Sequence, residues 1–135
     1  MIRYRHTIPD KVSFLNLYRT TGWNESGRFD EDRIYQGITR SWHIVCAYDP
    51  EERLIGMGRI VSDGGYQVFI TDMIVTPSHQ GKGIGRHILE RLLAYCKENE
   101  VRWVQLACAR GKKGFYEKFG FVERPIDGPG MHLFM

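Results

Sequence analysis

A run of alternating glycines is the part of the sequence whose residue types and spacing point most directly to chemistry. Gly81, Gly83 and Gly85 follow a predicted strand and open a predicted helix, with Lys82 and Arg86 beside them. Glycine lets the backbone turn sharply and lets its N–H groups approach an anion closely. The N-terminus of the helix adds unpaired donors and a partial positive charge. The pattern therefore predicts a site for a phosphate-bearing ligand.

The spacing of these glycines excludes two common nucleotide-binding loops. The third glycine comes one residue too early for the G-x-G-x-x-G pattern of dinucleotide-binding folds. The P-loop pattern also fails, because no Gly-Lys pair is followed by Ser or Thr at the required spacing. A tight strand–helix turn without a ligand is the simpler alternative, but three alternating glycines flanked by Lys and Arg favour the anion site.

Asp72 is a second residue with chemical potential, because it lies in an apolar run where an unpaired carboxylate would be costly to bury. Two interpretations stay open. Asp72 binds or, through water, deprotonates a substrate amine, or it points outward or pairs with Arg59 on the adjacent strand. Strand alternation places Asp72 on the side of Ile70 and Ile74, opposite Met73.

The elements that must position these residues follow from hydrophobic periodicity. Strands are predicted at residues 1–6, 42–48, 54–61, 66–75, 103–108, 121–123 and 130–134, and helices at 9–20, 30–39, 83–98 and 112–119. The strand–helix–strand unit from Tyr66 to Cys108 implies a locally parallel pair with a right-handed crossover. The predicted fold class is therefore α/β (α+β mixed), with a mixed, mostly antiparallel sheet that carries helices on its faces.

Two segments of the chain together resemble the GNAT superfamily of N-acetyltransferases. Residues 73–85 match a strand ending in Val-x-Pro followed by Gln/Arg-x-x-Gly-x-Gly/Ala, with Gln80, Gly83 and Gly85 at the defining positions. Residues 115–121 are similar to that family's FYxxxGF segment. The resemblance covers at least residues 54–124 and points to a compact, single-domain bacterial-type member.

This resemblance implies that acetyl-CoA lies in a V-shaped opening where the central parallel strands splay apart, between the strand ending at Val75 and the strand at 103–108. The implied cofactor-binding residues are Met73, Ile74, Val75, Gln80, Gly81, Lys82, Gly83, Ile84, Gly85 and Arg86. The chain departs from the family at residues 109–113, where many relatives carry an Asn that touches the cofactor. No cofactor contact is therefore carried over to that stretch.

Acetyl transfer to an amine needs a neutral amine, a polarised thioester carbonyl and a proton for the departing thiolate. The resemblance places the hydroxyl of Tyr116 near the thioester sulfur, and tyrosine is protonated at neutral pH. Packing of the short helix is the alternative role for Tyr116. A backbone N–H from residues 73–75 is the candidate to stabilise the oxyanion, and Asp72 is the second catalytic candidate.

The acceptor pocket is expected to involve Trp23, Phe29 and Asp72, with core packing as the alternative for the two aromatic residues. Glu25 is a candidate to hold a cationic amine, with a solvated loop glutamate as its alternative. The expected activity is acetyl transfer from acetyl-CoA to a primary amine, on a small molecule, by direct transfer in a ternary complex. A non-catalytic CoA-binding or sensing module on the same fold is the alternative.

Composition limits the remaining possibilities. A length of 135 residues predicts one domain, 1–135, and no apolar stretch is long enough to span a bilayer. The N-terminus lacks a signal peptide, so a cytoplasmic protein without a membrane partner is expected. A net charge of +3 that is spread along the chain argues against nucleic acid. Members of the resembled family are often dimers, which leaves a homodimer open.

The cysteines and histidines do not suggest a metal site. Cys46, Cys96 and Cys108 lie among apolar neighbours, which predicts buried, reduced thiols. No His/Cys cluster has the spacing of zinc ligands, so no metal is expected. His79 and His87 flank the glycine run and are not expected to be catalytic.

Overall fold

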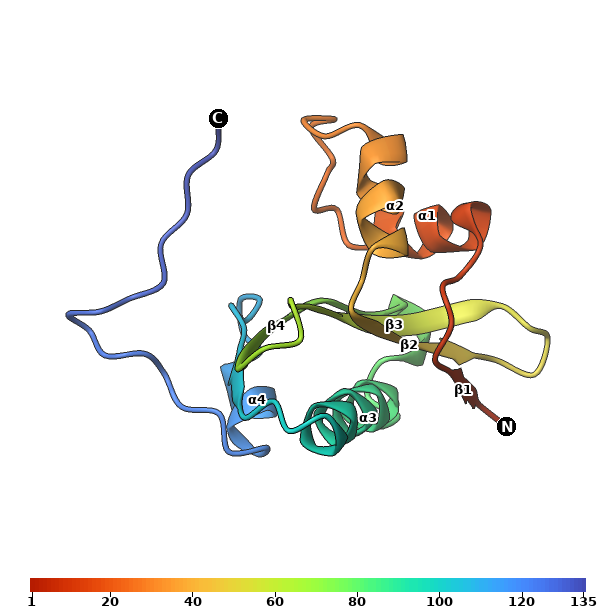
Figure 1. The fold of residues 1–135 in the computed structure, drawn as a ribbon. Coiled ribbons are helices and arrows are strands. Elements are labelled where there is room, and N and C mark those ends of the chain that lie inside the picture. Colours follow the sequence, from red (N-terminus) through yellow and green to blue (C-terminus); the bar gives the residue numbers. More distant parts are fainter. The chain divides into compact units, whose positions relative to one another are not determined.

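A five-stranded sheet in the order β1-β2-β3-β4-β5 forms the centre of residues 1–105 (Figure 1). The computed structural model describes all 135 residues and divides them into two compact units, residues 1–105 and 106–135. The strands are β1 (Arg3–Arg5), β2 (His43–Tyr48), β3 (Leu54–Val61), β4 (Gln67–Val75) and β5 (Trp103–Gln105). The neighbouring strands from β1 through β4 pair with one another in antiparallel fashion. β5 pairs with β4 in parallel.

Helices cover both faces of this sheet, as Figure 1 shows. α1 (Lys11–Arg19) and α2 (Glu31–Thr39) lie on one face, and α3 (Ile84–Glu98) lies on the other. Aspartates cap the first two helices, because the carboxylate of Asp10 accepts a 2.8 Å bond from the N–H of Ser13 and that of Asp30 a 3.1 Å bond from the N–H of Arg33. The arrangement confirms the predicted mixed, mostly antiparallel sheet with one parallel pair.

Each face of the sheet has its own apolar layer. On the α1–α2 face the buried residues are Phe14, Leu15, Leu17, Ile38, Ile44, Cys46, Tyr48, Leu54, Met57 and Ile74. On the other face α3 buries Ile84, Ile88, Leu89, Leu92 and Cys96, the apolar stripe that its periodicity predicts. α3 lies close to β3 because Gly58 has no side chain. A Cβ at Gly58 would lie 2.4 Å from Met73 Sδ and 2.9 Å from Ile88 Cγ2.

A β-bulge interrupts the pairing of β3 with β4. Arg59 pairs with Thr71 and Met57 with Ile74, so two residues of β4, Asp72 and Met73, oppose the single residue Gly58. Asp72 adopts a left-handed backbone conformation, with φ of 54°. The bulge turns Asp72 to the α1–α2 face, where Ile74 also lies.

The bulge corrects one prediction about this strand. Ile70 pairs with Ile60, whose neighbour Arg59 points to α2, so Ile70 faces α3 instead. Simple alternation had placed Asp72 on the side of Ile70. The prediction was wrong because the extra residue shifts the alternation at Asp72.

The second unit, residues 106–135, contains one short helix, α4 (Lys113–Glu117), and no strand. Around α4 the rings of Phe115, Tyr116, Phe119 and Phe121 contact one another. The strands predicted at 121–123 and 130–134 are absent, and the predicted strand at 103–108 ends at Gln105. Apolar residues of these segments, such as Val122 and Leu133, are 86% and 83% exposed. Their apolar character alone did not provide a partner strand.

Two features bear on the remaining compositional expectations. No helix combines the length and apolar character needed to cross a membrane. Cys46 and Cys96 are buried as predicted, and burial raises the pKa of the Cys46 thiol to about 12. Cys108 is exposed, which corrects the prediction of a third buried thiol. Its apolar neighbours lie beyond the end of β5 and do not enclose it.

Candidate active site

The glycine loop between β4 and α3 has the backbone conformation that its sequence requires. After β4 the chain makes a short 3-10 turn at Pro77–His79, and the side-chain amide of Gln80 donates a 2.9 Å hydrogen bond back to the carbonyl of Val75. Gly81 and Gly83 have φ angles of 77° and 83°, which other residues rarely adopt. Gln80 therefore fixes the start of the loop, and the two glycines turn it into α3.

The loop leaves a set of N–H groups free at the start of α3. The first helical hydrogen bond runs from the N–H of His87 to the carbonyl of Gly83, at 3.1 Å. The N–H groups of Ile84, Gly85 and Arg86 consequently have no acceptor within the helix. Lys82 forms no ion pair, whereas Arg86 binds Glu90 at 2.9 Å. This combination of free donors and positive charge suits a phosphate group.

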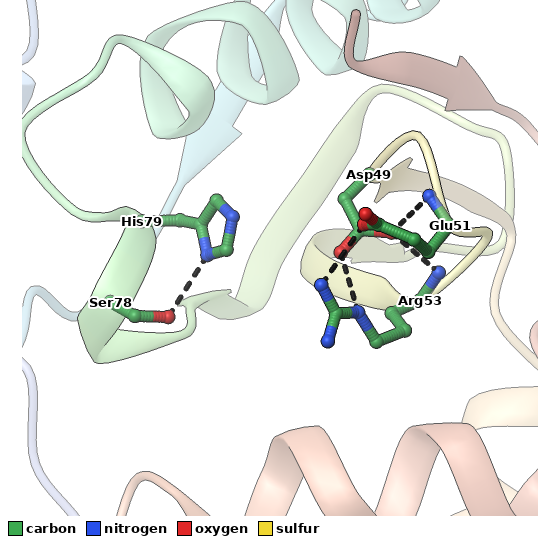
Figure 2. A network of polar contacts seen from close by, with 5 residues as sticks. All are labelled: Asp49, Glu51, Arg53, Ser78 and His79. Atoms are coloured by element: carbon green, nitrogen blue, oxygen red, sulfur yellow. Dashed lines mark hydrogen bonds and ion pairs between the residues drawn. The ribbon is translucent and has the colours of Figure 1, made fainter.

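A cavity of about 440 Å³ lies beside the glycine loop. It is lined by Ile2, Tyr4, His79, Lys82, Ile84 and His87. Figure 2 shows how His79 is held, with its Nδ1 3.0 Å from the hydroxyl of Ser78. The same figure shows the buried Asp49, which closes the turn between β2 and β3 by accepting bonds from the backbone and side chain of Arg53. Because Lys82 lines the cavity beside the glycine loop, it belongs both to that loop and to the cavity wall.

The edge of β4 that faces β5 is open along its second half. β5 pairs only with residues 67–69, whereas β4 continues to Val75. The N–H of Thr76 bonds to the carbonyl of Ile55 on the β3 side at 2.8 Å. Because backbone groups alternate along a strand, those of Ile74 also face β3, and those of Met73 and Val75 face the open edge. Two strand N–H groups are therefore available to a ligand there.

Asp72 lies in a partly buried ion pair. Its Oδ2 is 2.6 Å from the Nε of Arg59, and the two side chains are 18% and 17% exposed. Arg59 also donates to the carbonyl of Gly37 and the hydroxyl of Ser41, at 3.3 and 3.4 Å. Of the alternatives left open by the sequence, the geometry corresponds to pairing with Arg59. A carboxylate that accepts this bond is held in place beside α2.

A second cavity, of about 360 Å³, lies between the end of α1 and the start of α2. This α1–α2 cavity is lined by Tyr18, Arg19, Thr20, Thr21, Gly22, Asn24, Glu25 and Glu31. Trp23 and Phe29, the predicted pocket residues, are 49% and 48% exposed and do not line it. Trp23 instead packs edge-on against Tyr18. Of the lining residues the sequence indicated only Glu25, because the loop between the two helices has no periodicity that assigns its residues a face and so does not show which helix ends it brings together.

Tyr18 connects the α1–α2 cavity with the bulge of β4. Burial raises the pKa of the Tyr18 hydroxyl, and the negative charge of Asp72 raises this pKa further. The ring packs against Phe14 and Trp23. Tyr18 therefore remains protonated at neutral pH and brings a donor and acceptor hydroxyl to the cavity wall.

Tyr116 lies in the second unit, on α4. Its ring contacts Phe115 and Phe121, with centroids 5.0 and 5.9 Å apart. Burial raises the pKa of the Tyr116 hydroxyl above its ordinary value of 10.0, and Cys108 raises it further. The phenol is consequently protonated at neutral pH and able to donate a proton, while its ring packs the helix.

Comparison with known proteins gives a consistent result. A family model described as acetyltransferase (GNAT) domain matches residues 40–123, more than half of the chain. An uncharacterized N-acetyltransferase from Porphyra purpurea is 31% identical over 88 residues, which are 65% of this chain and 51% of that protein. Serotonin N-acetyltransferase 2, chloroplastic, from Oryza sativa subsp. japonica is 30% identical over 79% of this chain and 55% of that protein. The chain thus spans about half the length of these curated relatives.

Solved structures are similar over nearly the whole chain. A probable acetyltransferase from meticillin-resistant Staphylococcus aureus has a TM-score of 0.88 at 30% identity and covers 100% of both chains. A GNAT family acetyltransferase from Streptococcus pneumoniae TIGR4 has a TM-score of 0.81 at 30% identity, over 100% of this chain and 98% of that one. PaiA N-acetyltransferase from Thermoplasma acidophilum, in complex with coenzyme A, shares the fold, with a TM-score of 0.76 at 18% identity over 95% and 94% of the chains.

Proposed function

Because the chain belongs to the GNAT acetyltransferase family, we propose that it transfers an acetyl group from acetyl-CoA to a primary amine of a small molecule. The transfer is direct, with both substrates bound in a ternary complex. The observation that carries the proposal is the glycine loop, whose free N–H groups at Ile84, Gly85 and Arg86 lie beside the unpaired Lys82. The solved complex of the Thermoplasma acidophilum relative with coenzyme A supports the choice of cofactor.

The chain's own groups are assigned as follows. The loop N–H groups and Lys82 hold the pyrophosphate, and the open backbone N–H groups of Met73 and Val75 hold the pantetheine arm. One of these strand N–H groups donates to the thioester oxygen as negative charge develops on it. Metal ions have no part in this proposal, and no cluster of candidate metal ligands is present.

The chemical step needs one proton donor. The neutral amine nitrogen forms the new C–N bond to the thioester carbon as the C–S bond breaks. Tyr116 donates its hydroxyl proton to the departing thiolate, and the nitrogen releases a proton that restores the phenol through water. Asp72, whose charge is compensated by Arg59, positions the neutral amine as a hydrogen-bond acceptor without acting as a free base. An expected cytoplasmic location and a homodimer stay predictions.

Equilibrium binding of acetyl-CoA and release of the CoA thiol together test this function. Lys82→Gln should weaken acetyl-CoA binding by about tenfold, the lower end of the range for losing one charge-assisted hydrogen bond. Lys97→Gln, at the exposed far end of α3, is the matched control and should bind as the wild type does. Thiol release should rise with some members of a panel of primary amines.

Two negative outcomes have different meanings. Binding of acetyl-CoA without thiol release from any amine would favour the non-catalytic CoA-binding module. Equal affinity of the wild type and Lys82→Gln for acetyl-CoA, or no binding by either, would remove the glycine loop as the cofactor site and the proposal with it.

A further inference from the structure

The α1–α2 cavity offers hydrogen-bond acceptors where the rest of the site offers donors. The hydroxyl of Thr20 donates its one proton to the carbonyl of Leu17, and that of Thr21 donates to the carbonyl of Tyr18, both at 2.7 Å. A hydroxyl has one proton and two lone pairs. Both oxygens therefore keep lone pairs for a ligand, even though Thr21 also accepts a bond from the N–H of Trp23.

The charged groups of the cavity leave one negative charge unbalanced. Arg19 binds Glu31 in a two-point contact, from Nε at 2.8 Å and from Nη2 at 2.7 Å, so these two charges compensate each other. The carboxylate of Glu25 has neither a hydrogen bond nor an ion pair. The cavity lies between the C-terminal end of α1 and the N-terminal start of α2, whose opposite helix-dipole charges offset each other, so the excess negative charge is that of Glu25.

These features suit a cation with several N–H donors, which is the description of an alkylammonium group. The amine that attacks the thioester, however, has to lose its charge before it reacts. An ammonium ion beside a carboxylate is stabilised in its charged form. A group held by Glu25 is therefore poorly suited to be the nucleophile and well suited to be a second, unreactive end of the acceptor.

We propose that the α1–α2 cavity binds a second ammonium group of the acceptor, so that the acceptor is a diamine or polyamine. This inference rests on the proposed acetyl transfer. Glu25 and the lone pairs of Thr20 and Thr21 receive the charged end, and the other amine reacts in its neutral form. The side chain of Asn24 forms two hydrogen bonds with the backbone of Phe29, at 2.8 and 3.0 Å. These bonds fix the loop segment that carries Glu25 and so position its carboxylate for the ammonium group.

Matched pairs of amines test the proposal. 1,3-diaminopropane, 1,4-diaminobutane and 1,5-diaminopentane are each compared with the monoamine of equal chain length, in thiol-release kinetics and in calorimetric binding. The wild type should have a higher kcat/KM for at least one diamine than for its monoamine. Glu25→Gln should lower kcat/KM for that diamine about fivefold, the upper range for an exposed ion pair, and leave the monoamine unchanged. Glu98→Gln, exposed at the end of α3, is the control and should change neither.

The outcomes separate this inference from the proposed function. Equal kcat/KM for diamines and monoamines, or an equal loss for both in Glu25→Gln, would overturn the ammonium site while leaving the transferase intact. Diamine binding that weakens in Glu25→Gln without any thiol release would support the ammonium site and overturn the transferase. Absence of both diamine binding and turnover in the wild type overturns the ammonium site as well.

Discussion

Tyr116 has an observed role in packing and a proposed role as proton donor, and only the proposed role needs its hydroxyl oxygen. Its ring packs against Phe115 and Phe121, and its partly buried hydroxyl, whose pKa is raised by burial, keeps its proton at neutral pH. The ring alone accounts for packing, whereas the proposed protonation of the departing thiolate requires the O–H group. Removing the hydroxyl while keeping the ring therefore distinguishes the two.

Tyr116→Phe should lower kcat by about 10²-fold, the lower range for general acid catalysis. Acetyl-CoA affinity and the thermal unfolding midpoint should stay unchanged, because the ring contacts persist. Thiol-release kinetics, calorimetry and thermal unfolding provide the three readouts. A kcat equal to that of the wild type would assign Tyr116 to packing alone.

Asp72 combines an unusual backbone with a charge, and Asp72→Asn separates them. Asparagine tolerates the left-handed conformation at φ 54°, so the bulge should persist. Arg59 would lose its partner in a partly buried site, and we expect the free energy of unfolding to fall by about 1–3 kcal/mol. Urea denaturation measures this loss. An unchanged stability accompanied by a large fall in kcat would instead favour a role as a catalytic base.

The sequence predicted the backbone part of the site better than its side-chain part. Positive φ angles at Gly81 and Gly83 follow from glycine's freedom and could be predicted from spacing alone. The orientation of Asp72 could not be predicted, because the bulge arises from pairing with a distant strand opposite Gly58. The α1–α2 cavity also could not be predicted from the sequence, because its wall forms only when a loop without periodicity folds between two helices.

At the scale of elements, contact between α3 and β3 depends on Gly58. Its missing side chain leaves room for Met73 and for the branched residues Ile88 and Leu92 of α3. β4, which carries the candidate site, pairs with β3 directly beside this contact. Crowding here should therefore disturb both the stability of the sheet and the packing of the middle of α3 against it.

Gly58→Ala should destabilise the protein by about 1–3 kcal/mol, because the new methyl group would overpack the core. Gly37→Ala is the matched control. Gly37 lies in α2, a Cβ there meets nothing within 4 Å, and alanine should stabilise the helix by about 0.5–1 kcal/mol. Urea denaturation of both variants gives the comparison. A Gly58→Ala protein as stable as the wild type would show that Met73 and α3 adjust without cost.

Elements with strong internal patterns were predicted well, and elements that depend on a partner were not. α3 spans Ile84–Glu98 and was predicted at 83–98, because its apolar stripe repeats along the helix. The C-terminal segments 121–123 and 130–134 were also predicted as strands, yet neither forms one. A strand requires hydrogen bonds from a neighbour, and alternation does not specify that neighbour.

At the scale of the whole molecule, side-chain contacts join the N-terminal segment of the first unit to its sheet and to α3. Arg3 and Arg5 both pair with Glu52, and the guanidinium of Arg91 on α3 lies 4.1 Å from the ring centroid of Tyr4. Just beyond β1, the Nδ1 of His6 is 2.8 Å from the Nε2 of His43. The same histidine on β2 stacks against a tyrosine ring of α3, with centroids 3.5 Å apart. His43 therefore links the N-terminal segment, the sheet and a helix.

This position gives the stability of the fold a defined dependence on pH. Burial and the charge of His6 lower the pKa of His43 from 6.5 to about 4. The unfolded chain consequently binds a proton at this residue more readily than the folded chain does. Stability from this source is fully present above pH 6.5 and is lost as the pH falls from 6.5 toward 4.

We expect the loss to be about 1 kcal/mol, a value reduced from the full linkage because the ring is partly exposed to solvent. Urea denaturation at several pH values between 4 and 7 measures it. His43→Gln should remove this part of the pH dependence, whereas His132→Gln, in the exposed C-terminal segment, should retain it. If the wild type and His43→Gln lose stability equally over this range, the pH dependence comes from carboxylates elsewhere and not from the contact between His6 and His43.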